Sequence, residues 1–267
     1  EIFFKNLKNT VMNEENNTNL EQSSEEEFQN EPLTNSDAMS GVITSPSETF
    51  EKIVNSPKKN YWIIPVLISI VVGLASTFLF MQDAELVGRT MAKQKEKMME
   101  KFEEDMKDGK MTQEQVDQAM ESMNPKGIFF KIMGYGGSAV GPFIVLLLLS
   151  VIYLIALKII KAETDFSNIL NVVGLALLIG AIGNLISIVI SILKGNMSTI
   201  GPSLIMSESS VGEKMYALLT KIDVFSIWFY TVIAIGLSKV GRTSVTKTAT
   251  VVFGIWIVYI LVSSLAF

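Results

Sequence analysis

Two long apolar runs, joined by a short polar linker, constrain this chain more than any other feature. Residues 139–160 and 169–193 are almost free of charge, and residues 161–168 between them carry lysine, glutamate and aspartate. Each run has roughly 20 residues or more, which at about 1.5 Å per residue crosses the roughly 30 Å hydrocarbon core of a bilayer. The linker is too polar for lipid and long enough only for a tight return. The pattern predicts a transmembrane helical hairpin.

Composition indicates a membrane protein and excludes several kinds of catalytic and metal-binding site. Of its 267 residues 49% are hydrophobic, and it has neither cysteine nor histidine. Without cysteine there is no disulfide, thiol nucleophile or Cys-ligated metal, and without histidine the commonest metal ligand and proton-transfer group are missing. The methionines of residues 83–138 are spaced along helix faces rather than clustered as Cu(I) ligands. We therefore expect no enzyme activity, no cofactor and no metal site.

Three further apolar runs complete an all-α fold. We expect an integral membrane bundle of five transmembrane helices, with spans at about 62–81, 139–160, 169–193, 222–240 and 248–267.

The loop of residues 83–138 predicts an extramembrane helical hairpin. Residues 84–108 are charged with an apolar stripe, Gly109 interrupts the helical pattern, and Thr112 begins a second helix that Pro125 ends. The glycines at 134, 136 and 137 predict a flexible segment before the second span.

The first 44 residues are acidic and poor in apolar side chains, so we expect a disordered tail there and a membrane domain over 45–267. Ser45-Pro46-Ser47-Glu48 has the pattern of a helix start and predicts a short amphipathic helix on the membrane surface. Basic residues are densest on the short segments that share a side with this tail. The positive-inside rule then predicts a protein of the cell membrane with a cytoplasmic N-terminus and its C-terminus on the outer side.

Asp223 is the first candidate functional residue, in Asp223-Val224-Phe225-Ser226-Ile227-Trp228 at the start of the fourth span. A carboxylate there can bind a cation or pair with a lysine. We favour the simpler interpretation, that Asp223 is a helix-start charge stabilised by the helix dipole, with Trp228 as a packing anchor.

Asn184 is the second candidate, in the middle of the third span in Gly180-Ala181-Ile182-Gly183-Asn184. It could line a polar path. We favour an interhelical hydrogen bond at a close helix crossing, with Gly180 and Gly183 providing the space. No Asp, Glu, Lys or Arg lies deep in a predicted span, so a proton relay has no residues to use.

The layout resembles the Yip family of five-span membrane proteins over about residues 45–267. The resemblance is carried by Ser45-Pro46-Ser47-Glu48-Thr49-Phe50, by Asp165-Phe166-Ser167-Asn168-Ile169-Leu170 and above all by Asp223-Val224-Phe225-Ser226-Ile227-Trp228. It implies a five-span fold with a cytoplasmic N-terminus. Eukaryotic members interact with Ypt/Rab GTPases. This chain has a long loop after the first span and lacks their Asp-Leu-Tyr-Gly-Pro-type segment, so it is similar to the prokaryotic branch, and this departure makes GTPase binding doubtful.

We accordingly expect a non-enzymatic multi-pass protein that acts through protein or lipid contacts in membrane organisation. Its expected partners are the lipid bilayer and a membrane protein or a second copy of itself, with no nucleic acid. The alternative is a small-solute or ion permease component built around Asn184 and Asp223. An intramembrane enzyme is the weakest hypothesis, because the predicted spans hold no aspartate pair and no metal ligands.

Overall fold

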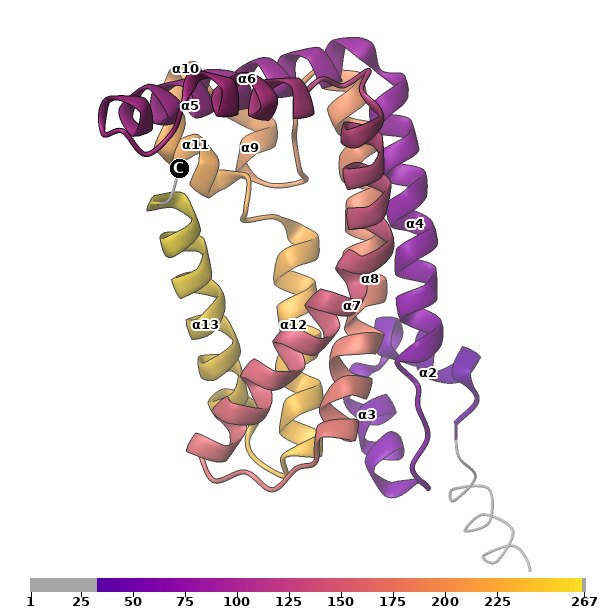
Figure 1. The fold of residues 1–267 in the computed structure, drawn as a ribbon. Coiled ribbons are helices and arrows are strands. Elements are labelled where there is room, and N and C mark those ends of the chain that lie inside the picture. Colours follow the sequence, from indigo (N-terminus) through magenta and orange to yellow (C-terminus); the bar gives the residue numbers. More distant parts are fainter. Residues whose placement is uncertain (1–32, 266–267) are drawn as a thin grey trace, which may run out of the picture.

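The structure, a computed structural model, describes residues 33–265, and every regular element in that range is a helix (Figure 1). Residues 1–32, most of the expected tail, lie outside the described part. The helices are α2 (Asn35–Thr44), α3 (Pro46–Asn55), α4 (Ile63–Gln82), α5 (Ala84–Lys107), α6 (Gln113–Ser122), α7 (Ile128–Ile159), α8 (Phe166–Lys194), α9 (Pro202–Ile205), α10 (Glu208–Val211), α11 (Glu213–Leu219), α12 (Val224–Val240) and α13 (Val245–Leu265).

Within the described residues, four helices are long and apolar enough to cross a membrane: α4, α7, α8 and α13. They occur where four of the five apolar runs predict them. The fifth run forms α12, which is apolar but has only 17 residues. At about 1.5 Å per residue this is roughly 26 Å, a little less than the hydrocarbon thickness. Four of the five expected spans are therefore confirmed as helices of sufficient length, and the fifth, α12, is not.

The expectation of a disordered tail up to residue 44 is wrong for its last part. Residues 35–44 form α2, whose start is capped by the Thr34 side chain accepting the backbone N–H of Asp37 at 3.1 Å. Ala38 and Val42, four residues apart on one helix face, are fully buried in the main hydrophobic core. A segment with little apolar surface folds here because the bundle buries Ala38 and Val42 fully and Met39 and Ile43 in part.

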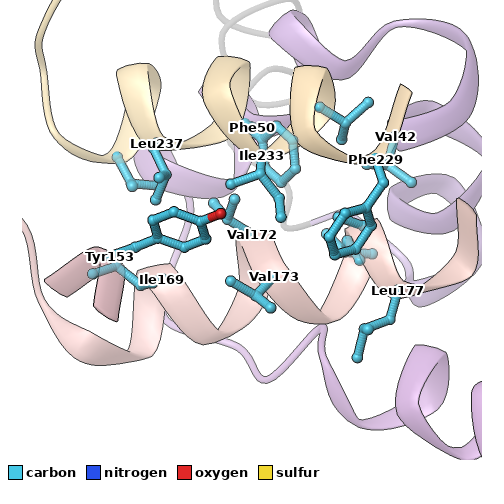
Figure 2. Packing of buried hydrophobic residues seen from close by; sticks show 14 of the residues in the cluster. Val42, Phe50, Tyr153, Ile169, Val172, Val173, Leu177, Phe229, Ile233 and Leu237 are labelled. Atoms are coloured by element: carbon cyan, nitrogen blue, oxygen red, sulfur yellow. The ribbon is translucent and has the colours of Figure 1, made fainter. Parts of the chain in front are cut away.

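The hydrophobic core lies at the end of the bundle that carries α2 and α3 (Figures 1 and 2). The Phe50 ring of α3 is fully buried beside Val172 of α8 and Gly236 of α12. A Cβ atom at Gly236 would lie 2.9 Å from the Phe50 ring, so the missing side chain makes room for the aromatic one. Helix α3 begins at Pro46 as expected, but it packs into the bundle rather than simply lying on a membrane surface.

Helix α7 begins eleven residues before the second predicted span, at Ile128 instead of 139. The glycines expected to form a flexible segment are helical. A Cβ atom at Gly134 would lie 2.5 Å from the Met81 side chain, so this glycine allows α7 to approach α4 closely. The helix also continues through Pro142, which cannot donate a backbone hydrogen bond.

Helices α5 and α6 form in the predicted loop and lie across the end of the bundle opposite α3 (Figure 1). Asp83 caps α5, and Thr112 and Gln115 form a capping box at α6. Arg89 of α5 donates a hydrogen bond to the Gly195 carbonyl at 3.1 Å, which ties this layer to the end of α8. The extramembrane position of these helices remains a prediction.

Candidate functional site

Helices α8 and α12 approach each other closely at Gly183 of the Asn184 segment. A Cβ atom at Gly183 would lie 2.6 Å from Phe225 Cβ, whereas one at Gly180 would lie 4.0 Å from the Phe229 ring, an ordinary contact. The absence of a side chain at Gly183 therefore admits Phe225 from α12. Trp228 lies outside this seam, half-buried, with its ring 6.4 Å from the Phe225 ring.

Asp223 is the N-cap of α12. Its Oδ1 accepts the backbone N–H groups of Phe225 and Ser226 at 2.9 and 3.1 Å, and its Oδ2 accepts the Ser226 hydroxyl. The carboxylate is buried, with 8% of the residue exposed, and within the described residues it forms no ion pair. The neighbouring Lys221 instead donates to the Ser263 hydroxyl at 2.6 Å. The N–H groups in the first turn of α12 thus stabilise the negative charge of the Asp223 carboxylate.

Asn184 is exposed, and its side chain forms no hydrogen bond with another described residue. The structure therefore does not give it the interhelical hydrogen bond that we expected. That role belongs to Asn171, which is buried near the start of α8. Its Oδ1 accepts the backbone N–H of Tyr61 at 2.8 Å, and its Nδ2 donates to the Lys59 carbonyl at 2.8 Å. The signal for Asn171 was the same as for Asn184, a lone amide in an apolar run.

A recess of about 880 Å³ opens inside the bundle next to this seam. Helices α4, α7, α8 and α12 form its walls, and residues 197–199 and Thr220 close it toward the α5 layer. Asn184, Asp223, Phe225, Ser226, Gly180 and Gly183, six of the seven residues singled out from the sequence, line it. Its other polar lining is mostly hydroxyl groups from three helices, among them Ser69, Ser76, Thr77, Ser138 and Ser187, and the sequence did not show that these helices bring them together.

The hydroxyl groups of the recess fall into two sets. Some are paired inside the protein: Ser69 donates to the Pro65 carbonyl at 2.8 Å, and the hydroxyls of Thr77 and Ser138 are 2.5 Å apart. The hydroxyl of Ser76 has no hydrogen-bond partner among the described residues, and only 6% of this residue is exposed to solvent. The Ser187 side chain, like that of Asn184, forms no hydrogen bond with another described residue. The recess therefore presents polar groups with unused hydrogen-bonding capacity.

The recess ends inside the bundle. Val66 on α4, Val173 on α8 and Ile233 on α12 each lie about one turn closer to α3 than the deepest lining residues, and all three are fully buried. These side chains belong to the main hydrophobic core. The lining of the recess therefore stops at a layer of buried apolar side chains.

Comparison with known proteins identifies the family. The model of the Yip1 domain matches residues 40–267. The chain belongs to the Yip1 family. It is similar to the membrane protein YknW of Bacillus subtilis (strain 168), with 25% identity over 241 residues, which cover 87% of this chain and 92% of the relative. No solved structure matches significantly. The family resemblance inferred from the three sequence elements is confirmed.

All the lining residues of the recess lie within the Yip1 domain. So does a second, wider groove of about 1640 Å³ between α5 and residues 194–220. That groove is lined by charges of both signs, such as Lys101 and Glu104, and lies in the outer helical layer. The recess is the site of interest here, because it is lined by four apolar helices and by six of the seven residues singled out from the sequence.

Proposed function

We propose that this Yip1-family protein is a non-enzymatic five-span membrane protein that binds lipid or protein partners in the bilayer and does not conduct solutes. The observation that carries the proposal is the apolar floor of the recess. A conducting path needs polar groups or water on both sides of the bilayer midplane. Without them, transfer of a polar solute from water into a dry apolar region costs several kcal/mol of free energy. A recess that ends at packed valine and isoleucine side chains has the form of a binding site.

The second candidate function is a small-solute or ion permease component. One observation favours it: Asn184 and Asp223, the two residues on which that hypothesis was built, line the same recess. Osmotic swelling of proteoliposomes separates the two functions, with glycerol and sodium chloride as the probes. We expect rates equal to those of empty liposomes. A faster rate that Asn184→Leu abolishes, in a variant with unchanged melting temperature, would favour the permease.

The proposed topology counts α12 as the fifth span, because it packs between α8 and α13 and is apolar along its length. The proposed orientation places the α3 end of the bundle in the cytoplasm, in the cell membrane. Lys58, Lys161, Lys239 and Arg242 all lie at that end, on short segments. The C-terminal end of α13 then lies on the outer side.

Partner binding is tested by affinity purification of the full chain from mild detergent, with mass spectrometry of the bound proteins and lipids. We expect specific lipids, a membrane protein or a second copy of the chain to be retained relative to an unrelated membrane protein of similar size. Retention of bulk membrane lipids alone would contradict the proposal.

A further inference from the structure

The recess changes from polar to apolar along its length. Ser69 on α4 donates to the Leu177 carbonyl on α8, 108 residues later, at 3.4 Å. The two helices run in the same direction (Figure 1) and rise equally per residue, so Ser76 lies at about the level of Asn184. The first turn of α12 lies at this level too, because Phe225 packs on Gly183.

This level of the recess, toward the α5 layer, holds the free polar groups. They are the side chains of Ser76, Asn184 and Ser187, and the capped carboxylate of Asp223 lies in the wall formed by α12. Together they offer hydroxyl and amide donors and acceptors around one space.

The deeper level of the recess is apolar. Val72, Val145, Leu177 and Phe229 line it, together with Tyr230, whose ring is largely apolar. The Ser69 hydroxyl is already bonded to backbone carbonyls. A ligand that fills the whole recess must therefore be polar at one end and apolar at the other.

The charges in the wall narrow the class of ligand. Of the described residues that line the recess, Asp223 alone carries a charge. An anionic headgroup would meet this carboxylate without a lysine or arginine to compensate it. A cation would find the carboxylate oxygens already accepting three hydrogen bonds from Phe225 and Ser226. Neutral hydroxyl groups match the free serine and asparagine side chains best.

We propose that the recess binds a neutral lipid with a sugar headgroup. The headgroup hydroxyls bond to Ser76, Asn184 and Ser187, and the first part of an acyl chain packs on Val145 and Leu177. The buried Ser76 hydroxyl takes part after rotation about its χ1 bond. The volume of about 880 Å³ lies within the roughly 300–1,000 Å³ of small-molecule sites, which accommodates the headgroup and part of a chain. The proposal rests on the proposed function as a binder of membrane components.

The lipid origin of the ligand follows from the location of the recess. Three of its walls, α4, α7 and α8, are helices long and apolar enough to span a membrane, and its polar end is the end that faces the α5 layer. A lipid of the leaflet on the α5 side has this same direction, with its headgroup toward α5 and its chains toward the centre of the bundle. A free sugar would leave the apolar floor without contacts.

The test is a titration of the purified full chain in detergent, followed by native mass spectrometry and melting temperature. The probes are a monoglucosyl diacylglycerol, the matching diacylglycerol, phosphatidylglycerol and free glucose. We expect a one-to-one adduct and a raised melting temperature with the glycolipid, and at least tenfold weaker binding of the other three. Equal binding of the diacylglycerol, of the anionic lipid or of glucose would overturn the proposal.

Three variants locate the binding. Asn184→Leu removes hydrogen bonds from an exposed position, and Val145→Trp fills the deeper part of the recess from a side chain that is 40% exposed. We expect each to weaken glycolipid binding at least tenfold without lowering the melting temperature of the ligand-free protein. Asn60→Leu, which changes an exposed asparagine at the other end of the bundle, is the matched control and should bind like the wild type.

Wild-type binding by both recess variants would also overturn the proposal. Solute flux through proteoliposomes would instead contradict the proposed function, so the two failures are distinguishable.

Discussion

The side-chain amide of Asn171 on α8 accepts the backbone N–H of Tyr61 at 2.8 Å, just before α4 begins. The same side chain also accepts the Trp62 N–H at 3.3 Å and donates to the Lys59 carbonyl at 2.8 Å. One asparagine therefore satisfies backbone groups at the turn between α3 and α4. This bond fixes where the first span enters the bundle.

We expect Asn171→Leu to destabilise the protein by about 3 kcal/mol, because it leaves buried backbone groups without partners. Thermal unfolding in detergent measures the effect. Asn60→Leu, at an exposed position, is the control and should change stability by less than about 0.5 kcal/mol. Similar melting temperatures for the two variants would show that the Asn171 bonds contribute little.

Gly183→Val should separate α8 from α12 and cost about 2 kcal/mol, since the new Cβ would lie 2.6 Å from Phe225 Cβ. The matched control is Gly254→Val on α13, where nothing lies within 4 Å of an added Cβ, and we expect it to change stability by less than about 1 kcal/mol. Detergent unfolding compares the two. The seam would be less tight than described if both variants melted alike.

The ion pair between Lys58 and Asp165, with 2.8 Å between Nζ and Oδ2, predicts a pH dependence. The hydrogen bond from Lys58 lowers the pKa of the Asp165 carboxyl by more than burial raises it, and the N–H groups of Asn168 and Ser167 lower it further. A lowered folded-state pKa gives stability that is present above the unfolded value of about 3.9 and lost as the pH falls through the folded value. Melting temperature should therefore fall from about pH 5 downward, and less steeply in Asp165→Asn. An equally steep fall in the variant would assign the loss to other carboxylates.

The proposed topology predicts opposite labelling of two single cysteines, which this cysteine-free chain allows without further changes. Ser36→Cys in α2 and Gln118→Cys in α6 are both exposed positions. With an impermeant thiol reagent on intact cells, we expect Gln118→Cys to react and Ser36→Cys to react only after permeabilisation. The reverse pattern would invert the orientation.

The sequence was sufficient to locate the long apolar helices and insufficient to show which of their faces point into the bundle. Apolar runs located the spans because a helix must be long and apolar to cross lipid. In a bilayer, however, lipid-facing and core-facing residues are both apolar, so periodicity does not tell which side of α8 is inside. For this reason Asn184, which is exposed in the recess, and Asn171, which is buried against Tyr61, could not be told apart.

The differences in α2 and α7 have related causes. Ala38 and Val42 are too few to predict a helix, and only tertiary contact with α8 and α3 makes residues 35–44 fold. Gly134 was predicted to give flexibility, but it allows close packing against Met81. The sequence alone does not distinguish a glycine needed for close packing from one needed for a turn. Asp223, by contrast, was predictable, since capping depends on the few residues that follow it.

Pro142 gives α7 a mechanical property. Because proline has no N–H, the carbonyl of Ser138, four residues earlier, receives no hydrogen bond from within the helix. A Cβ atom at Gly73 would lie 3.4 Å from that carbonyl oxygen, so α4 approaches α7 beside the interrupted rung of the ladder. We expect α7 to bend most easily at this point. The part of α7 before Pro142, which includes the recess residue Ser138, can then move while the part after it, which packs around the buried Tyr153, stays in place. The recess can therefore widen or narrow without a change in the hydrophobic core.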